Sequence, residues 1–116
     1  MALTREQLSE LVKDLEDLSF ELRESLAGSA QAARPVELDQ PAVGRVSRID
    51  AIQQQKMLEA NRQAQTMRLA LVRAALLRAE EDEYGDCKGC GESIGHKRLK
   101  ARPESAFCIE CQAARE

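Results

Sequence analysis

Two pairs of cysteines are the residues of this sequence whose type and spacing point most directly to chemistry. Cys87 and Cys90 form one C-x-x-C pair, Cys108 and Cys111 form another, and 17 residues separate the two pairs. Each pair can present two thiolate sulfurs from one short turn, about 2.3 Å from a tetrahedral ion. Such spacing is typical of a four-thiolate zinc site. Because four sulfurs fill the tetrahedron, we predict one structural Zn²⁺ with no position left for a catalytic water.

Three other uses of paired cysteines compete with zinc. A redox C-x-x-C would sit beside a β-α-β pattern, which this sequence lacks. Disulfides would require export, since thiols stay reduced in the cytoplasm. A four-thiolate iron site has the same spacing, so the sequence favours zinc and leaves iron open.

The residues around the cysteines predict a small module that depends on the metal. A segment of about 30 residues has too little apolar area to fold alone. Ile94, Leu99 and Phe107 are its expected core, and residues 109–115 are expected to form a short final helix. A basic segment at residues 96–102 could touch phosphate or an acidic protein face, but we favour the interpretation that it offsets the negative zinc–thiolate centre.

Composition argues against an enzyme and against a protein that binds nucleic acid mainly through its phosphates. Only 3% of the 116 residues are aromatic and 32% are charged, so a large pocket lined by aromatic side chains is not expected. The single histidine, His96, has no evident partner and is expected to be exposed. The net charge of −3 opposes phosphate neutralisation. We therefore predict a protein that is not an enzyme and has no specific DNA binding.

No targeting or membrane-spanning segment is recognisable. The N-terminus turns polar at once and lacks an apolar signal region. The most apolar stretch, Leu69–Leu77, is interrupted by Arg73 and is too short to cross a bilayer. The sequence therefore predicts a cytoplasmic protein without membrane contact.

The first long segment, at about residues 4–29, is predicted to be a helix that begins with a capping box. Thr4 and Gln7 can each satisfy an early backbone amide. Gly28 and Pro35 mark its expected end. Leucines recur along it at alternating spacings of 3 and 4 residues, which is the pattern of a coiled-coil seam: Leu8, Leu11, Leu15, Leu18 and Leu22.

A second long helix is predicted at about residues 47–82, after a connector at residues 30–46 that contains two prolines and a glycine. Residues at alternating spacings of 3 and 4 form its expected seam: Met57, Ala60, Ala64, Met67, Leu71 and Ala74.

The two helices are predicted to fold back on each other as an antiparallel coiled-coil hairpin, with Leu15 and Leu22 facing the Met57–Ala74 seam. Residues 4–29 carry seven acids and three bases, whereas residues 47–80 carry three acids and six bases. Opposite charges favour the pairing, although each exposed contact contributes only about 0.2–1 kcal/mol. The alternatives are that these helices pair with another chain or pack in an ordinary bundle.

The fold class expected from these elements is all-α and elongated. A helical hairpin at residues 1–84, with the connector as its tip, precedes a four-cysteine zinc finger with a short C-terminal helix at residues 85–116. We expect the chain to be a monomer.

The residues of the C-terminal segment closely resemble the zinc finger of the DksA/TraR family, whose members are also named DnaK suppressor proteins. The resemblance covers about 30 residues closely and the hairpin more loosely. It includes residues other than the metal ligands: Tyr84, Gly85, Cys87, Cys90, Gly91, Glu92, Ile94, Arg98, Leu99, Ala101, Pro103, Cys108, Cys111 and Gln112.

This resemblance implies a bacterial transcription regulator that binds RNA polymerase directly rather than DNA. In the family, the zinc module docks on the rim of the polymerase secondary channel and the coiled coil enters the channel. Longer members act together with the alarmone ppGpp, so ppGpp co-regulation is implied as well. A zinc-stabilised helical adaptor without an effect on transcription is the alternative function.

The expected tip departs from the family pattern. The best-known members carry an Asp-x-x-Asp-x-Ala motif between the helices, and this motif is absent from residues 37–51. Charged residues at the tip are the remaining candidates for contact with a partner: Asp39, Arg45, Arg48 and Asp50.

Overall fold

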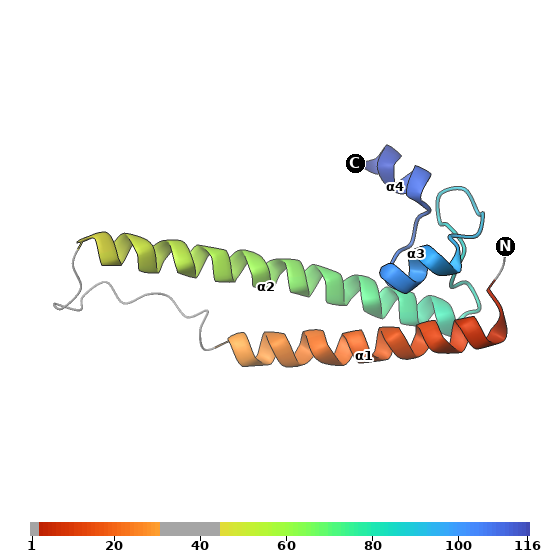
Figure 1. Ribbon diagram of the computed structural model, residues 1–116, viewed down its shortest axis with the longest axis horizontal. Helices are drawn as coiled ribbons and strands as arrows, with labels where there is room; N and C mark the ends of the chain where they lie inside the picture. Colours follow the sequence, from red (N-terminus) through yellow and green to blue (C-terminus); the bar gives the residue numbers. More distant parts are fainter. Residues whose placement is uncertain (1–2, 31–44) are drawn as a thin grey trace.

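The computed structural model describes residues 3–30 and 45–116, with side chains in the second of these ranges from residue 48 onward. Its four helices are α1 (Arg5–Ser29), α2 (Arg45–Glu80), α3 (His96–Ala101) and α4 (Ile109–Arg115). Figure 1 shows α1 and α2 side by side and antiparallel, with α3, α4 and the N-terminus gathered at one end. The molecule measures 62 × 29 × 20 Å along its principal axes. It is therefore the elongated helical hairpin that the sequence predicts.

The capping box predicted at the start of α1 is present. The Thr4 hydroxyl accepts a hydrogen bond from the backbone amide of Gln7 at 3.1 Å, and the Gln7 side chain accepts one from the Thr4 amide at 3.0 Å. Two donors that the first turn would otherwise leave unpaired are thus satisfied.

The predicted leucine seam of α1 faces α2. Leu11 and Leu15 are completely buried and Leu22 is nearly so, while Leu8, Leu18 and Leu26 pack against this core from its margins. Burying a leucine side chain stabilises the fold by about 1.5–3 kcal/mol. The first seam is therefore confirmed.

The predicted seam of α2 is wrong. Met57, Met67 and Leu71 are 67%, 69% and 50% exposed, and the alanines between them are exposed as well. The residues that face α1 belong instead to a second repeat two positions earlier, in which Leu69 and Val72 are buried. Toward the tip most members of this repeat are polar, as at Arg62 and Gln65, and only Leu58 is apolar there. A search for apolar residues therefore selects the wrong face.

Polar side chains join the two helices in the half nearer the tip. Arg62 donates hydrogen bonds through Nη1 to the backbone carbonyl of Leu26 and to the hydroxyl of Ser29. Gln65 donates through Nε2 to the hydroxyl of Ser25 at 3.0 Å. Because Arg62 lies opposite the last turn of α1, α2 continues beyond the end of α1 (Figure 1).

The base of the hairpin and the C-terminal segment share one hydrophobic core. Leu99 of α3 is completely buried, and Ile94 packs against the same cluster of leucines from α1 and α2. Leu99 therefore packs against the helices, not only within the predicted cysteine module. Phe107 is half-buried, with the Arg115 guanidinium 4.3 Å from its ring centroid. The predicted division at residues 84 and 85 stays a prediction, although the core crosses it.

No helix among the described residues is long and apolar enough to cross a membrane.

Candidate metal centre

The first cysteine pair lies on a tight turn that follows α2. Asp86 and Ser93 form an antiparallel bridge across it. The backbone amide of Cys87 donates to the carbonyl of Glu92 at 2.7 Å, and the amide of Gly91 donates back to the carbonyl of Cys87 at 2.9 Å. Gly91 has a φ of 78°, a left-handed conformation that glycine adopts at little cost. The turn therefore holds both sulfurs of the pair on the same short loop.

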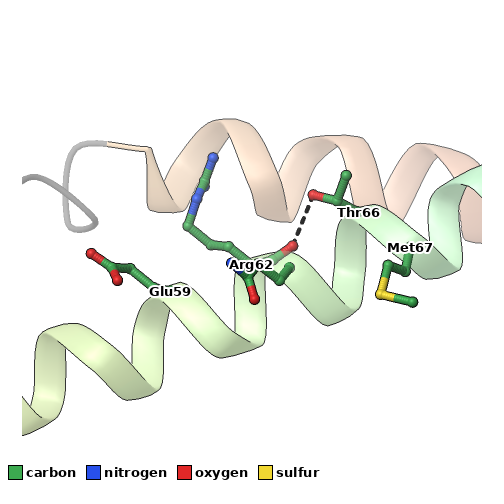
Figure 2. Close-up of a pocket in the computed structure, with 5 residues that line it drawn as sticks. Glu59, Arg62, Thr66 and Met67 are labelled. Carbon is green, nitrogen blue, oxygen red and sulfur yellow. Dashed lines mark hydrogen bonds between the residues drawn. The ribbon is translucent and has the colours of Figure 1, made fainter.

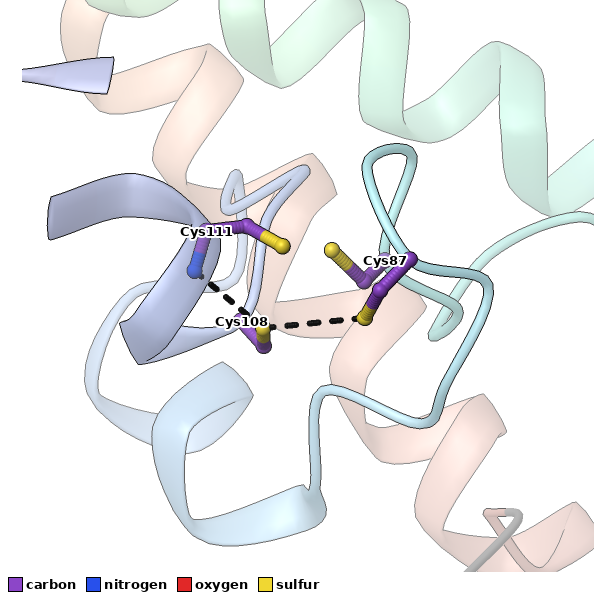
Figure 3. Close-up of side chains that lie close together, drawn as sticks. Cys87, Cys108 and Cys111 are labelled. Atoms are coloured by element: carbon purple, nitrogen blue, oxygen red, sulfur yellow. Dashed lines mark hydrogen bonds between the residues drawn. The ribbon is translucent and has the colours of Figure 1, made fainter. Parts of the chain in front are cut away.

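The second cysteine pair lies at the start of α4, which spans the residues predicted for the final helix. Cys108 is the N-cap residue, and its sulfur accepts a hydrogen bond from the backbone amide of Cys111 at 3.4 Å. The helical turn places the Cys108 and Cys111 sulfurs toward the first pair (Figure 3).

The four sulfurs converge on one point. All four Sγ atoms lie within 4.8 Å of one another, and those of Cys90 and Cys108 are 3.8 Å apart. Sulfurs bound at about 2.3 Å to a tetrahedral ion would be separated by about 3.8 Å. The spacing of the sulfurs and the absence of other donor types from the cluster fit Zn²⁺ or another thiolate-binding ion.

Gly89 lies directly against the second cysteine pair. A Cβ atom at this position would lie 3.0 Å from the Cys111 sulfur and 3.3 Å from the Cys111 Cβ atom. Real Cβ atoms rarely approach so closely, so a larger residue here would require the Cys111 side chain to shift by a few tenths of an ångström. Glycine between the first two cysteines thus leaves space for the Cys111 side chain of the second pair.

The cysteine thiols influence one another's ionisation. Burial opposes ionisation of Cys87, but hydrogen bonds from the backbone amides at Cys108, Cys90 and Gly89 outweigh burial and lower its pKa to about 6. Hydrogen bonds with the sulfurs of Cys108 and Cys87 raise the pKa of Cys111 to about 12. A bound cation would stabilise all four thiolates together, because its charge compensates theirs.

The basic segment before the second pair contacts α1. Lys100 donates hydrogen bonds through Nζ to the carboxylates of Glu10 and Asp14, the latter at 2.9 Å. His96 is partly buried rather than exposed as predicted, and its Nε2 lies 3.8 Å from Oε2 of the same Glu10. Part of the segment therefore pairs with acidic residues of α1 in its own chain.

Residues 102–107 connect α3 to Cys108 and also attach the cysteine module to α2. Nε of Arg68 lies 2.7 Å from Oε2 of Glu104, a carboxylate that is 3% exposed. The Tyr84 hydroxyl donates to the carbonyl of Pro103 at 2.7 Å, and burial raises the pKa of this hydroxyl. Arg78 donates to the carbonyl of Ser105 at 3.4 Å. This attachment cannot be predicted from the sequence, since no local pattern distinguishes Glu104 or Arg68 from surface charges.

The structure separates the candidate tip residues from the cysteines. Arg48 and Asp50 are exposed near the start of α2, at the end of the molecule opposite the cysteine module (Figure 1). Asp39 lies outside the described residues, and Arg45 begins α2 with a side chain that is not described. The four cysteines and the described tip candidates, Arg48 and Asp50, thus belong to two distant regions.

Comparison with known proteins matches both the cysteine module and the fold. Residues 82–116 match the model of the prokaryotic dksA/traR C4-type zinc finger. A segment of 56 residues is 38% identical to the RNA polymerase-binding transcription factor DksA of Haemophilus influenzae, and covers 48% of this chain and 39% of that protein. The DksA of Escherichia coli K12 is 34% identical over 56 residues, which cover 48% of this chain and 37% of the relative.

The fold similarity extends well beyond the zinc-finger match. The structure of transcription factor DksA2 from Pseudomonas aeruginosa superposes with a TM-score of 0.76 over 96% of this chain and 84% of that one, at 23% sequence identity. The aligned segment is about two fifths of the length of the curated relatives. The hairpin and the zinc finger are therefore arranged as in DksA2, while the closer sequence similarity is limited to part of the chain.

Proposed function

The chain is a DksA/TraR-type C4 zinc finger protein, and from this premise we propose that it is a bacterial transcription regulator that binds RNA polymerase directly. The observation that carries the proposal is that a four-sulfur module of this family is attached to the base of a long helical hairpin. Relatives that share the module are named RNA polymerase-binding transcription factors. A polymerase partner also implies the cytoplasmic location expected from the sequence.

We propose that the four cysteines hold one structural Zn²⁺. Cys87, Cys90, Cys108 and Cys111 would supply all of its ligands, and the bound ion would tie the turn after α2 to the start of α4. Because the coordination sphere would be complete, the ion would not activate water or substrate. The protein is accordingly proposed to act by binding and not as an enzyme.

The elongated shape of the molecule supports different roles for its two ends. The base combines the zinc module with the buried core, so it can serve as a rigid anchor on the polymerase surface. The hairpin can then carry its tip a long way from that anchor, since the molecule is 62 Å long. By analogy with the family, we propose that the hairpin enters the secondary channel and that Asp39, Arg45, Arg48 and Asp50 contact the polymerase there.

Binding to purified core RNA polymerase tests the proposal. The zinc-loaded chain should be retained by immobilised polymerase at low salt, and the Escherichia coli relative should displace it if the two proteins share a site. The Cys108→Ser variant, which removes one metal ligand, should bind much more weakly. Retention without competition would indicate a different polymerase surface. No retention of folded, zinc-loaded protein would favour the helical adaptor.

The effect on transcription requires a second experiment. In vitro transcription with and without ppGpp would show whether binding alters initiation and whether the alarmone changes the effect. Omitting promoter DNA from the binding assay separates polymerase binding from DNA binding. Retention that depends on DNA would contradict direct binding to polymerase.

A further inference from the structure

Residues 102–107 join the metal centre to the hairpin along one side of α2. Cys108 follows this segment directly, and the Ala106 carbonyl accepts a hydrogen bond at 2.9 Å from the backbone amide of Lys88, next to the first cysteine pair. The segment thus reaches both cysteine pairs. α4 packs against none of the other three helices, and Figure 1 shows it set apart from the hairpin. The position of α4 on the hairpin therefore depends on this segment.

Three side chains from α2 and the turn after it bind the segment, and one of these contacts differs in kind. Tyr84 and Arg78 donate hydrogen bonds to backbone carbonyls of the segment. A backbone carbonyl is present whatever the residue, so these two contacts do not depend on the side chains of the segment. Arg68 instead binds a side chain, with its Nε 2.7 Å from Oε2 of Glu104. The choice of residue therefore matters most at Glu104.

The Glu104 carboxylate depends strongly on this one contact. Its side chain is only 2% exposed, and its Oε1 atom has no hydrogen-bond partner among the described residues. A buried charge without a partner is costly, so the carboxylate must stay beside the Arg68 guanidinium. Hydrogen bonds weaken steeply away from their preferred geometry, whereas apolar contacts are not directional. The contact therefore fixes where the segment lies along α2.

α2 uses different faces to bind α1 and to bind this segment. Figure 2 shows Arg62 reaching toward α1, beside a shallow groove of about 580 Å³. Arg68 follows six residues later, which places it about 120° away around the helix axis. Arg68 reaches the cysteine module instead of α1. A substitution at Arg68 can thus alter the attachment of the module without removing the contacts between α1 and α2.

We propose that Glu104 is a positioning residue, which acts through Arg68 to hold α4 and the four cysteines at one orientation on the hairpin. The inference rests on the proposed function, because a fixed orientation lets the zinc module and the tip engage the polymerase as one rigid body. When contact at one end already places the other end correctly, less orientational freedom is lost on binding. Glu104 thus serves polymerase binding through geometry more than through stability.

Residual dipolar couplings of the full, zinc-loaded chain in a weakly aligning medium test the orientation directly. In the wild type, the amide couplings of α2 and of residues 108–115 should fit one common alignment. In Arg68→Leu/Glu104→Leu the two sets should need separate alignments, although no unpaired charge remains and much of the stability returns. Arg73→Leu is the matched control, since Arg73 is an exposed arginine on the same helix; it should keep the common alignment.

The conservative variant Glu104→Gln separates the hydrogen bond from the charge. Its amide oxygen can still accept the hydrogen bond from Nε of Arg68, so the common alignment should persist. If the leucine pair loses zinc, Arg68→Met in the Glu104→Gln background breaks the same hydrogen bond and leaves no buried charge. This second variant should show the same loss of common alignment.

Retention on immobilised core RNA polymerase connects the orientation to binding. The leucine pair should bind about tenfold more weakly than the wild type or worse, because its two ends no longer act as one body. Glu104→Gln and Arg73→Leu should bind like the wild type. Zinc content and thermal melts of the same samples show that a loss of binding does not come from unfolding.

Three outcomes would overturn the proposal. A common alignment in the leucine pair would exclude a positioning role for Glu104, and so would an equal loss of alignment in Arg73→Leu. Loss of alignment with unchanged retention would exclude a role in polymerase binding. If the wild type is not retained at all, the proposed function fails. The dipolar couplings need no polymerase, so they still decide whether Glu104 positions α4.

Discussion

The base of the hairpin and the half of the hairpin nearer the tip are held together by different kinds of contact. At the base, completely buried residues from three helices meet: Leu11 and Leu15 of α1, Val72 of α2 and Leu99 of α3. Toward the tip, the corresponding positions of α2 carry Arg62 and Gln65, which hydrogen-bond to α1.

This difference indicates where the stability of the molecule is concentrated. Each buried aliphatic side chain contributes about 1.5–3 kcal/mol, whereas each net hydrogen bond contributes about 0.5–1.5 kcal/mol. The base also receives the attachments of the cysteine module, including the pair formed by Arg68 and Glu104. We therefore expect the base of the hairpin to be stable and the half nearer the tip to open more readily. The boundary between the two halves should lie between Gln65 and Leu69.

Removal of the metal should produce the largest effect, and it should be confined to the base. Cys108→Ser should lower zinc content and disorder residues 85–116, because metal binding contributes about 10–16 kcal/mol to the folding of small zinc fingers. Hydrogen exchange should become faster around Leu99, with little change at Arg62. His96→Ala is the control and should retain one zinc per chain. Absence of zinc and iron from carefully reduced wild-type protein would contradict the metal site.

Truncating a buried leucine of α1 and an exposed methionine of α2 should show which repeat of α2 packs against α1. Leu15 is completely buried, so Leu15→Ala should lower the free energy of unfolding by about 2–5 kcal/mol. Met67 is 69% exposed, so Met67→Ala should change it by less than about 0.5 kcal/mol under conditions in which the chain is monomeric. Chemical denaturation measures both. Similar losses in the two variants would mean that α1 packs on the Met57–Ala74 repeat after all.

The ion pair between the partly exposed Arg68 of α2 and the buried Glu104 of the module should be sensitive to the loss of one partner. Arg68→Leu leaves the Glu104 carboxylate buried without its ion pair, so stability should fall by about 1–3 kcal/mol. Replacing both residues by leucine should restore much of this loss, because no unpaired charge remains. A thermal-melt double-mutant cycle measures the coupling. Additive effects of the two substitutions would show that the pair does not fix the module on the hairpin.

Loss of the polar contacts toward the tip should have a smaller and more local effect. Arg62→Met removes the hydrogen bonds to Leu26 and Ser29, and should cost about 1 kcal/mol. Hydrogen exchange should become faster in the last turn of α1, while amides near Leu11 keep their protection. If exchange accelerates equally at both ends, the hairpin opens as one unit and the boundary we propose is absent.

Charge substitutions at the tip should have the smallest effect on stability. Asp50 is exposed, so Asp50→Asn should change the melting temperature very little, and we expect the same of Asp39→Asn. If the tip enters the polymerase channel, these substitutions should nevertheless alter in vitro transcription, because charges interact more strongly where water is excluded. Unchanged transcription in both variants, beside an active wild type, would exclude these two carboxylates from a role at the tip.

Local patterns in the sequence were enough for α1, α2 and α4 and for the cluster of four cysteines, but not for α3, which the sequence analysis does not predict. The capping box at Thr4 and the leucine repeat of α1 depend on neighbours three or four residues away, so they can be recognised without the fold. The two C-x-x-C pairs can be recognised in the same way, because each pair lies on one turn. A site with four thiolate ligands then requires the two pairs to meet. The four sulfurs accordingly come together as predicted.

Only the tertiary structure decided which face of α2 meets α1 and how the module is attached. Both faces of α2 carry a repeat with coiled-coil spacing, and hydropathy alone favours the one that proved to be exposed. The choice depends on partners distant in the sequence: Ser29 accepts a hydrogen bond from Arg62, and Glu10 accepts one from Lys100. A polar side chain can face a helix interface when such a partner is present, and the partner is known only once the chain has folded.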